Sequence, residues 1–176
     1  MRTVNSHGFP GNEFEKEKPD NTFRIFAVGG STTYGAAANV DNTWPAHLQK
    51  IVNEKTTGKK IEVINAGISG ADSNSELNLI EQKLLTFSPD LIIIYDGWND
   101  LRANHTLMEV KENWETICEF GKKNDFDVII TLQPIAGFAD KILTKQELEY
   151  AQTGTDYNNS PLIESLSVYQ DYAKKL

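Results

Sequence analysis

The stretch FAVGGSTTYG, residues 26–35, places a serine where a serine can do chemistry. Three residues suited to burial are followed by Gly29 and Gly30, and Ser31 comes directly after them. Two kinds of site use such a layout. A glycine-rich turn can cradle a phosphate with its backbone N–H groups, or it can present a nucleophilic hydroxyl while the glycines let a substrate carbonyl approach closely.

The phosphate interpretation lacks its usual cation. A P-loop requires G-x-x-x-x-G-K-[ST], with the lysine on the phosphates, and GGSTTYG contains no lysine. The dinucleotide fingerprint G-x-G-x-x-G is not matched either. A flavodoxin-like phosphate or nucleotide binder that relies on backbone N–H groups alone stays open as a second alternative.

The hydroxyl interpretation gains support from two further stretches. NAGISGADS (65–73) follows a second predicted strand, and DGWND (96–100) follows a third. Ligands of parallel sheets bind beyond the carboxyl ends of the strands, so we expect Ser31, Gly70 and Asn99 to converge. The Gly70 N–H and the Asn99 amide would then hold a developing oxyanion, and each such donor is worth roughly 3–4 kcal/mol in comparable hydrolases.

Strands and helices alternate along the chain. Predicted strands cover 23–30, 61–67, 90–97 and 127–134, and predicted helices cover 42–55, 73–87, 106–124 and 165–176, with a short helix and a polar loop within 144–162. This alternation predicts an α/β fold with a parallel sheet and helices on both faces, because the strands are apolar throughout.

Several helix details follow from the residue pattern. Thr43 is the predicted cap of the first long helix, with Pro45 in its first turn and Trp44, Leu48, Ile51 and Val52 on its buried face. Ser73 and Glu76 have the spacing of a capping box. Thr32 and Thr33 are predicted to cap the short helix that follows Ser31.

Composition narrows the classes of partner. The formal net charge of -8 argues against nucleic acid. No apolar run reaches the ~18 residues of a membrane span, and the amino terminus has no apolar core of a signal peptide. We therefore expect a cytoplasmic protein by default, or a secreted or envelope-anchored one if an upstream leader was trimmed. Residues 1–22 are predicted to be an irregular lead-in, and 23–176 a single domain.

Metal and thiol chemistry are not expected. His7, His47 and His105 lie far apart in the sequence and form no cluster with ligand spacing. Cys118 sits in a helical pattern and is predicted to be a buried, inert thiol. We therefore expect no cofactor and no metal.

Three motifs carry a family resemblance. GGST (29–32), NAGISG (65–70) and GWND (97–100) resemble the first three sequence blocks of the SGNH, or GDSL-like, hydrolases, although GGST replaces the more familiar GDS. TWP (43–45) and NSHGFPG (5–11) also resemble family features. The resemblance implies a flavodoxin-like three-layer α/β/α sandwich, Ser31 as nucleophile, and Gly70 and Asn99 as oxyanion donors. It also implies hydrolysis of ester or acyl bonds in lipids, acyl thioesters or acetylated carbohydrates.

The catalytic base is missing from these motifs. The family carries an Asp-x-x-His segment after a fifth strand, and this chain has neither the segment nor a place for the strand. We expect a sheet that lacks its last strand, in a domain that is truncated at its carboxyl end or is a degenerate relative. His105, His7 and His47 are weaker candidates for the base. The first alternative function is therefore a non-catalytic module that binds a glycan or acyl ligand.

Other residues are expected to line or support the site. Trp98, Gly30 and Thr32 are placed on the substrate side, and Trp98 either lines an acyl or sugar pocket or packs under its loop. Asp100 is expected to accept backbone N–H groups that hold the GWND turn, and Asn65 to tie the first two strand ends together. Asp96 is interpreted as a turn residue.

Overall fold

A computed structural model describes residues 4–138, 140–156 and 158–176; residues 1–3 of the predicted lead-in lie outside it. Its strands are β1 (Thr22–Gly29), β2 (Lys60–Asn65), β3 (Leu91–Asp96) and β4 (Asp127–Leu132). Its helices are α1 (Ser31–Tyr34), α2 (Trp44–Lys55), α3 (Ser73–Gln82), α4 (Trp98–Arg102), α5 (Leu107–Asn124), α6 (Lys145–Thr153) and α7 (Leu162–Lys175). Short 3-10 turns cover Val40–Asn42 and Leu84–Phe87.

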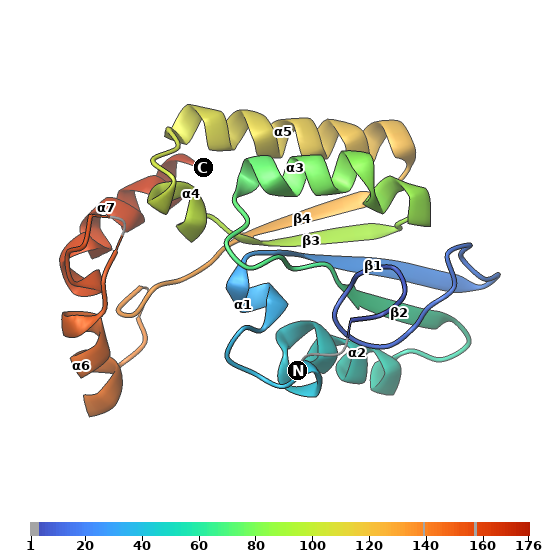
Figure 1. Ribbon diagram of the computed structural model, residues 1–176, viewed down its shortest axis with the longest axis horizontal. Coiled ribbons are helices and arrows are strands. Elements are labelled where there is room, and N and C mark those ends of the chain that lie inside the picture. Colours follow the sequence, from blue (N-terminus) through green and yellow to red (C-terminus); the bar gives the residue numbers. More distant parts are fainter. Residues whose placement is uncertain (1–3, 139, 157) are drawn as a thin grey trace.

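The four strands form one parallel sheet in the order β2-β1-β3-β4. Helices α3 and α5 cover one face, and α1 and α2 lie on the other (Figure 1). The predicted three-layer α/β fold is thereby confirmed. Because all four strands run the same way, their carboxyl ends share one edge, beyond which α1, α4 and α7 lie in Figure 1.

The main core lies between the sheet and the layer of α3 and α5. Ile92 and Ile94 of β3 are fully buried there, and so are Ile80 of α3 and Ile117 of α5. Asp96 continues the same alternation along β3 and is fully buried as well. A charged side chain at this position is therefore directed into the core and not into solvent.

The second face of the sheet is less completely covered than the apolar sequence predicted. Side chains of β4 alternate between exposed and half-buried, and Ile129 is 49% exposed. Residue Ile129 is in register with Ile93 of β3, on the face where α2 packs against β2. The prediction of burial on both faces is wrong for β4: α5 packs against one face of this edge strand, whereas α1 and α2, on the other face, pack against β1 and β2.

The amino-terminal lead-in is irregular yet packed into the fold. Arg24 of β1 is fully buried and donates hydrogen bonds to the backbone oxygens of Glu15, Lys16 and Phe87. It also forms an ion pair with Glu62 at 2.9 Å. This guanidinium therefore ties the lead-in to β1, β2 and the end of the α3 region.

The predicted details of the helices over 42–55 and 73–87 are confirmed only in part. Thr43 caps α2 as predicted, accepting a hydrogen bond from the Ala46 N–H at 3.4 Å. The predicted buried face of α2 is wrong at Ile51, which is 49% exposed, and the neighbouring His47 is exposed as well. The helix predicted over 73–87 is divided into α3 and a 3-10 turn.

Two capping predictions are wrong. The N-cap of α3 is Asp72, which accepts a hydrogen bond from the Ser75 N–H at 2.9 Å. Glu76 is fully buried and makes no capping bond. The N-cap of α1 is Gly30, and no side chain caps that helix.

Candidate active site

Ser31 stands on a tight turn directly after β1. Gly29 has a φ of 149°, and a Cβ there would lie 2.3 Å from Thr33 Oγ1 and 2.5 Å from the Tyr95 oxygen. Glycine is therefore required for β1 to end here. Ser31 begins α1 and is half-buried at the carboxyl edge of the sheet.

Three strand ends converge beside this serine. A Cβ on Gly30 would stand 2.2 Å from Asn99 Nδ2, 3.0 Å from Asp96 Oδ2 and 3.4 Å from the Ala71 oxygen. Asn99 Nδ2 donates a hydrogen bond to that Ala71 oxygen at 2.6 Å. The second hydrogen of the amide group is not used by this bond, so Asn99 retains a donor next to the Ser31 turn.

Gly70 lies on the loop between β2 and α3, one residue before Ala71. It has a φ of 84°, it is exposed, and nothing lies within 4 Å of the position that a Cβ would take. The backbone at this point therefore borders open space on the edge of the sheet where Ser31 and Asn99 stand.

Asn65 and Thr33 join the ends of β1 and β2. Asn65 Nδ2 donates to the Thr33 oxygen at 2.8 Å, and Asn65 Oδ1 accepts from the Gly67 N–H at 3.0 Å. The Thr33 hydroxyl in turn accepts a hydrogen bond from Trp44 Nε1 at 3.2 Å. Asn65 therefore makes the structural tie that the sequence predicted, whereas Thr32 is exposed beside it.

Asp100 is a fully buried carboxylate at the start of α4. It accepts hydrogen bonds from the Ser73 N–H at 3.0 Å and from the Ser73 hydroxyl at 2.6 Å. Asn113 of α5 donates to the same hydroxyl at 2.9 Å. Asp100 does accept a backbone N–H, but from the first turn of α3 and not from its own GWND turn.

Trp98 is half-buried and packs against α7. Its ring meets that of Tyr169 edge-on at 5.7 Å between centroids. The Tyr169 hydroxyl donates a hydrogen bond to the Gln133 oxygen, just after β4. Trp98 therefore joins α4 to α7, in keeping with the packing interpretation of this residue.

The three histidines do not gather at Ser31. His105 faces carboxylates with both ring nitrogens, Asp100 Oδ1 at 3.2 Å from Nδ1 and Asp72 Oδ2 at 3.6 Å from Nε2. His7 donates from Nε2 to the Phe14 oxygen at 2.9 Å within the lead-in. Within the part of the chain that the structure describes, no histidine hydrogen-bonds to the Ser31 hydroxyl.

A pair of buried acids behind the site, Glu76 and Asp96, was not predicted from the sequence. Burial raises the pKa of Asp96 to about 7, with the Asp100 charge adding to the rise. Burial also raises the pKa of Glu76 well above its usual range. The signal was present, because Glu76 shares the spacing of Ile80 and Leu84 and so lies on the apolar face of its helix.

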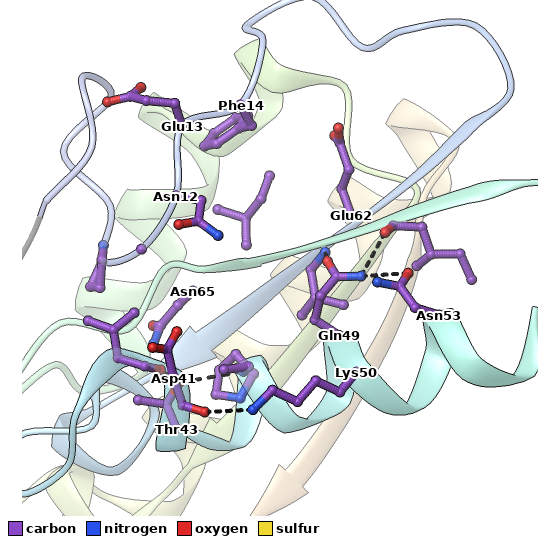
Figure 2. A pocket seen from close by; sticks show the side chains of 18 of the residues that line it. Asn12, Glu13, Phe14, Asp41, Thr43, Gln49, Lys50, Asn53, Glu62 and Asn65 are labelled. Carbon is purple, nitrogen blue, oxygen red and sulfur yellow. Dashed lines mark hydrogen bonds between the residues drawn. The ribbon is translucent and has the colours of Figure 1, made fainter.

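A cavity of about 440 Å³ lies elsewhere, along the outer edge of β2 (Figure 2). It is lined by the lead-in around Asn12 and Phe14, by α2 and by β2. Gln49 occupies part of that edge, donating to the Ile61 oxygen at 2.8 Å and accepting from the Val63 N–H at 2.7 Å. Ser31 and Asn99 do not line this cavity.

Neither a metal-binding cluster nor a membrane-spanning helix is found among the described residues. Among residues 4–138, 140–156 and 158–176, no three His, Cys, Asp or Glu side chains are placed to hold a metal ion. Over the same ranges, no helix has the length and apolar character needed to cross a bilayer. Cys118 is a free thiol and is only partly buried, so the prediction of a buried thiol is wrong.

A parallel sheet that carries a serine turn, a glycine loop and an asparagine amide at its carboxyl edge is the layout of the SGNH class of hydrolases. A sequence model of the GDSL-like Lipase/Acylhydrolase family matches residues 27–160. The chain belongs to this family.

Individual relatives agree with that assignment. An arylesterase from Vibrio mimicus is 31% identical over 77 residues, which are 44% of this chain and 38% of that protein. The match therefore spans well under half of the relative's length. Among solved structures, the SGNH-hydrolase family esterase AlinE4 is 22% identical with a TM-score of 0.56, over 85% of this chain and 82% of its own.

A second solved structure has the same fold. The psychrotrophic esterase EstA from Pseudoalteromonas sp. is 17% identical with a TM-score of 0.56, over 88% of this chain and 95% of its own.

Proposed function

We propose that this chain is the serine-bearing part of a hydrolase that cleaves ester or acyl bonds, with Ser31 as its nucleophile. The observation that supports this most strongly is the convergence of Ser31, Gly70 and Asn99 at one edge of the sheet. Membership of the GDSL-like lipase and acylhydrolase family also supports cleavage of ester or acyl bonds.

The proposed reaction has two halves. Ser31 Oγ attacks the acyl carbonyl while a base takes the hydroxyl proton. The Ser31 and Gly70 N–H groups, with the Asn99 amide, stabilise the oxyanion of the tetrahedral intermediate. The alcohol leaves with the proton, and water then releases the acid from the acyl-enzyme by the reverse series of steps.

The base is proposed to come from a part of the whole protein outside residues 1–176. The support is the position of the histidines, because His105 faces a carboxylate with each ring nitrogen and His7 donates to a backbone oxygen. The substrate is proposed to be a lipid ester, an acyl thioester or an acetylated carbohydrate. Trp98, Gly30 and Thr32 are proposed to lie along it.

A second candidate, a non-catalytic module that binds a glycan or acyl ligand, is favoured by the same histidine positions. A fluorophosphonate probe separates the two functions, because it forms a bond only with an activated serine. We expect covalent labelling of the peptide that contains Ser31 in the whole protein, and none in Ser31→Ala. Unlabelled protein that still binds an acylated glycan would support the module instead.

A further inference from the structure

Three carboxyl groups meet behind the Ser31 turn, and all three are fully buried. Asp100 is satisfied by Ser73 and His105. Glu76 and Asp96 are less well paired: both Glu76 oxygens and Asp96 Oδ2 make no well-formed hydrogen bond, although the Trp114 indole, itself unpaired, faces Glu76. A buried acceptor without a donor is unfavourable, so these three oxygens need an explanation.

The two unsatisfied carboxyl groups lie within hydrogen-bonding reach of each other. The other groups that face them are Asp100 on α4, the Trp114 indole on α5, and Tyr169 and Tyr172 on α7. None of these is a cation. Two carboxylates cannot both be ionised side by side in a site of low dielectric, so one of them must keep its proton.

Asp96 lies between the turn that carries Asn99 and the turn that carries Ser31. Its Oδ1 accepts the Gly97 N–H at 2.9 Å, in the turn that carries Asn99. Its Oδ2 lies 3.0 Å from the position of a Gly30 Cβ. Asp96 therefore fixes the turn that carries Asn99 while it lies against the turn that carries Ser31.

We propose that Glu76 and Asp96 share one proton and that this pair is the positioning element of the oxyanion hole. The proton resides on Glu76, and Asp96 remains the carboxylate, because Asp96 accepts the Gly97 N–H whereas neither Glu76 oxygen accepts a backbone N–H. The Glu76 hydroxyl then donates to Asp96 Oδ2, which satisfies the orphaned oxygen and orients Asp96. This inference rests on the function proposed above.

The shared proton also sets the charge behind the site. With it, the pair carries one negative charge; without it, two charges stand behind the position where the oxyanion develops. The second charge would oppose the oxyanion electrostatically. The raised pKa values of both groups, which burial causes, agree with a proton that is retained at neutral pH.

The first test does not depend on turnover. Infrared spectra of the whole protein should show a protonated carboxyl band from about pH 5 to 8, where ordinary carboxyl groups are ionised. Glu76→Gln should remove the band, and Glu81→Gln, an exposed glutamate on the same helix, should leave it. A band that is absent from the unaltered protein, or that survives in Glu76→Gln, overturns the proposal.

The second test concerns positioning. The NMR signal of the Asn99 side-chain amide should shift when the shared proton is lost at alkaline pH. This pH-dependent shift should be absent in Glu76→Gln, because the glutamine amide donates a hydrogen bond but does not titrate. In the unaltered protein, kcat should decrease as the shared proton is lost at alkaline pH. In Glu76→Gln, the factor by which kcat decreases over the same pH range should be at least about tenfold smaller. An Asn99 resonance that titrates equally in both proteins overturns the positioning role. An absence of Ser31-dependent turnover contradicts only the proposed function, since the infrared and resonance readouts still decide the pair.

Discussion

Gly30 and Asn99 form one wall of the candidate site, because a methyl group on Gly30 would stand 2.2 Å from Asn99 Nδ2. The two residues come from different strand ends, β1 and β3, which are hydrogen-bonded neighbours in the sheet. The contact brings the GGST and GWND motifs together. It also explains why the residue before Ser31 has no side chain.

Gly30→Ala should disable the site. The added methyl group would overlap Asn99 Nδ2 and press on Asp96 Oδ2 at 3.0 Å. The φ of Gly30 is -78°, so the effect is steric and does not come from a forbidden backbone conformation. We expect about 1–3 kcal/mol lower stability from overpacking and a fall in kcat of roughly 10²-fold or more. An unchanged kcat in folded Gly30→Ala would show that this wall does not serve the reaction.

Asn99→Ala should lower kcat by about 10²–10³-fold, the usual cost of losing one oxyanion donor. KM for a short-chain ester should change much less, because the donor acts mainly on the oxyanion. Asn78→Ala is the matched control, since Asn78 also donates one bond to a backbone oxygen but on an exposed helix face. Equal kinetics in the two variants would remove Asn99 from the oxyanion hole.

Gly70 and Gly58 provide a comparison in which only position differs. Both have positive φ, 84° and 82°, and neither would bring a Cβ within 4 Å of another atom. Alanine at either position should therefore cost a similar ~1 kcal/mol of stability. Only Gly70→Ala should reduce kcat, because the strain moves an N–H that holds the oxyanion. Equal kcat values in Gly70→Ala and Gly58→Ala would show that Gly70 serves only the turn conformation and not the oxyanion.

The stability of the fold should depend on the Glu76–Asp96 pair as pH changes. Burial raises the pKa of Asp96 to about 7 and that of Glu76 well above its usual range, so the native state holds protons that the unfolded chain has released. The free energy of unfolding should therefore fall as pH rises from about 4.5 towards 7, by up to about 1.4 kcal/mol per pH unit for one proton. Chemical denaturation across this range should show a shallower fall in Glu76→Gln. A steeper fall in the variant would contradict the retained proton.

The sequence predicted the parts of the fold that follow from regular patterns. Alternating strands and helices gave the parallel sheet, and the rule that ligands bind at carboxyl strand ends brought Ser31 and Asn99 to one edge. The incomplete cover over Ile129 could not be predicted, because an apolar strand looks the same whether or not a helix reaches it. Burial of Glu76 was overlooked because Ser73 and Glu76 match a capping box, while the cap itself is Asp72.

The most direct test of the central claim is hydrolysis of a short-chain nitrophenyl ester by residues 1–176, beside the Ser31→Ala variant, with and without added imidazole. Imidazole supplies a base in solution, and the variant measures the background that imidazole produces without Ser31. We expect a release of nitrophenol that depends on Ser31 and grows with imidazole concentration. Equal rates with and without the serine hydroxyl at every imidazole concentration would contradict Ser31 as the nucleophile.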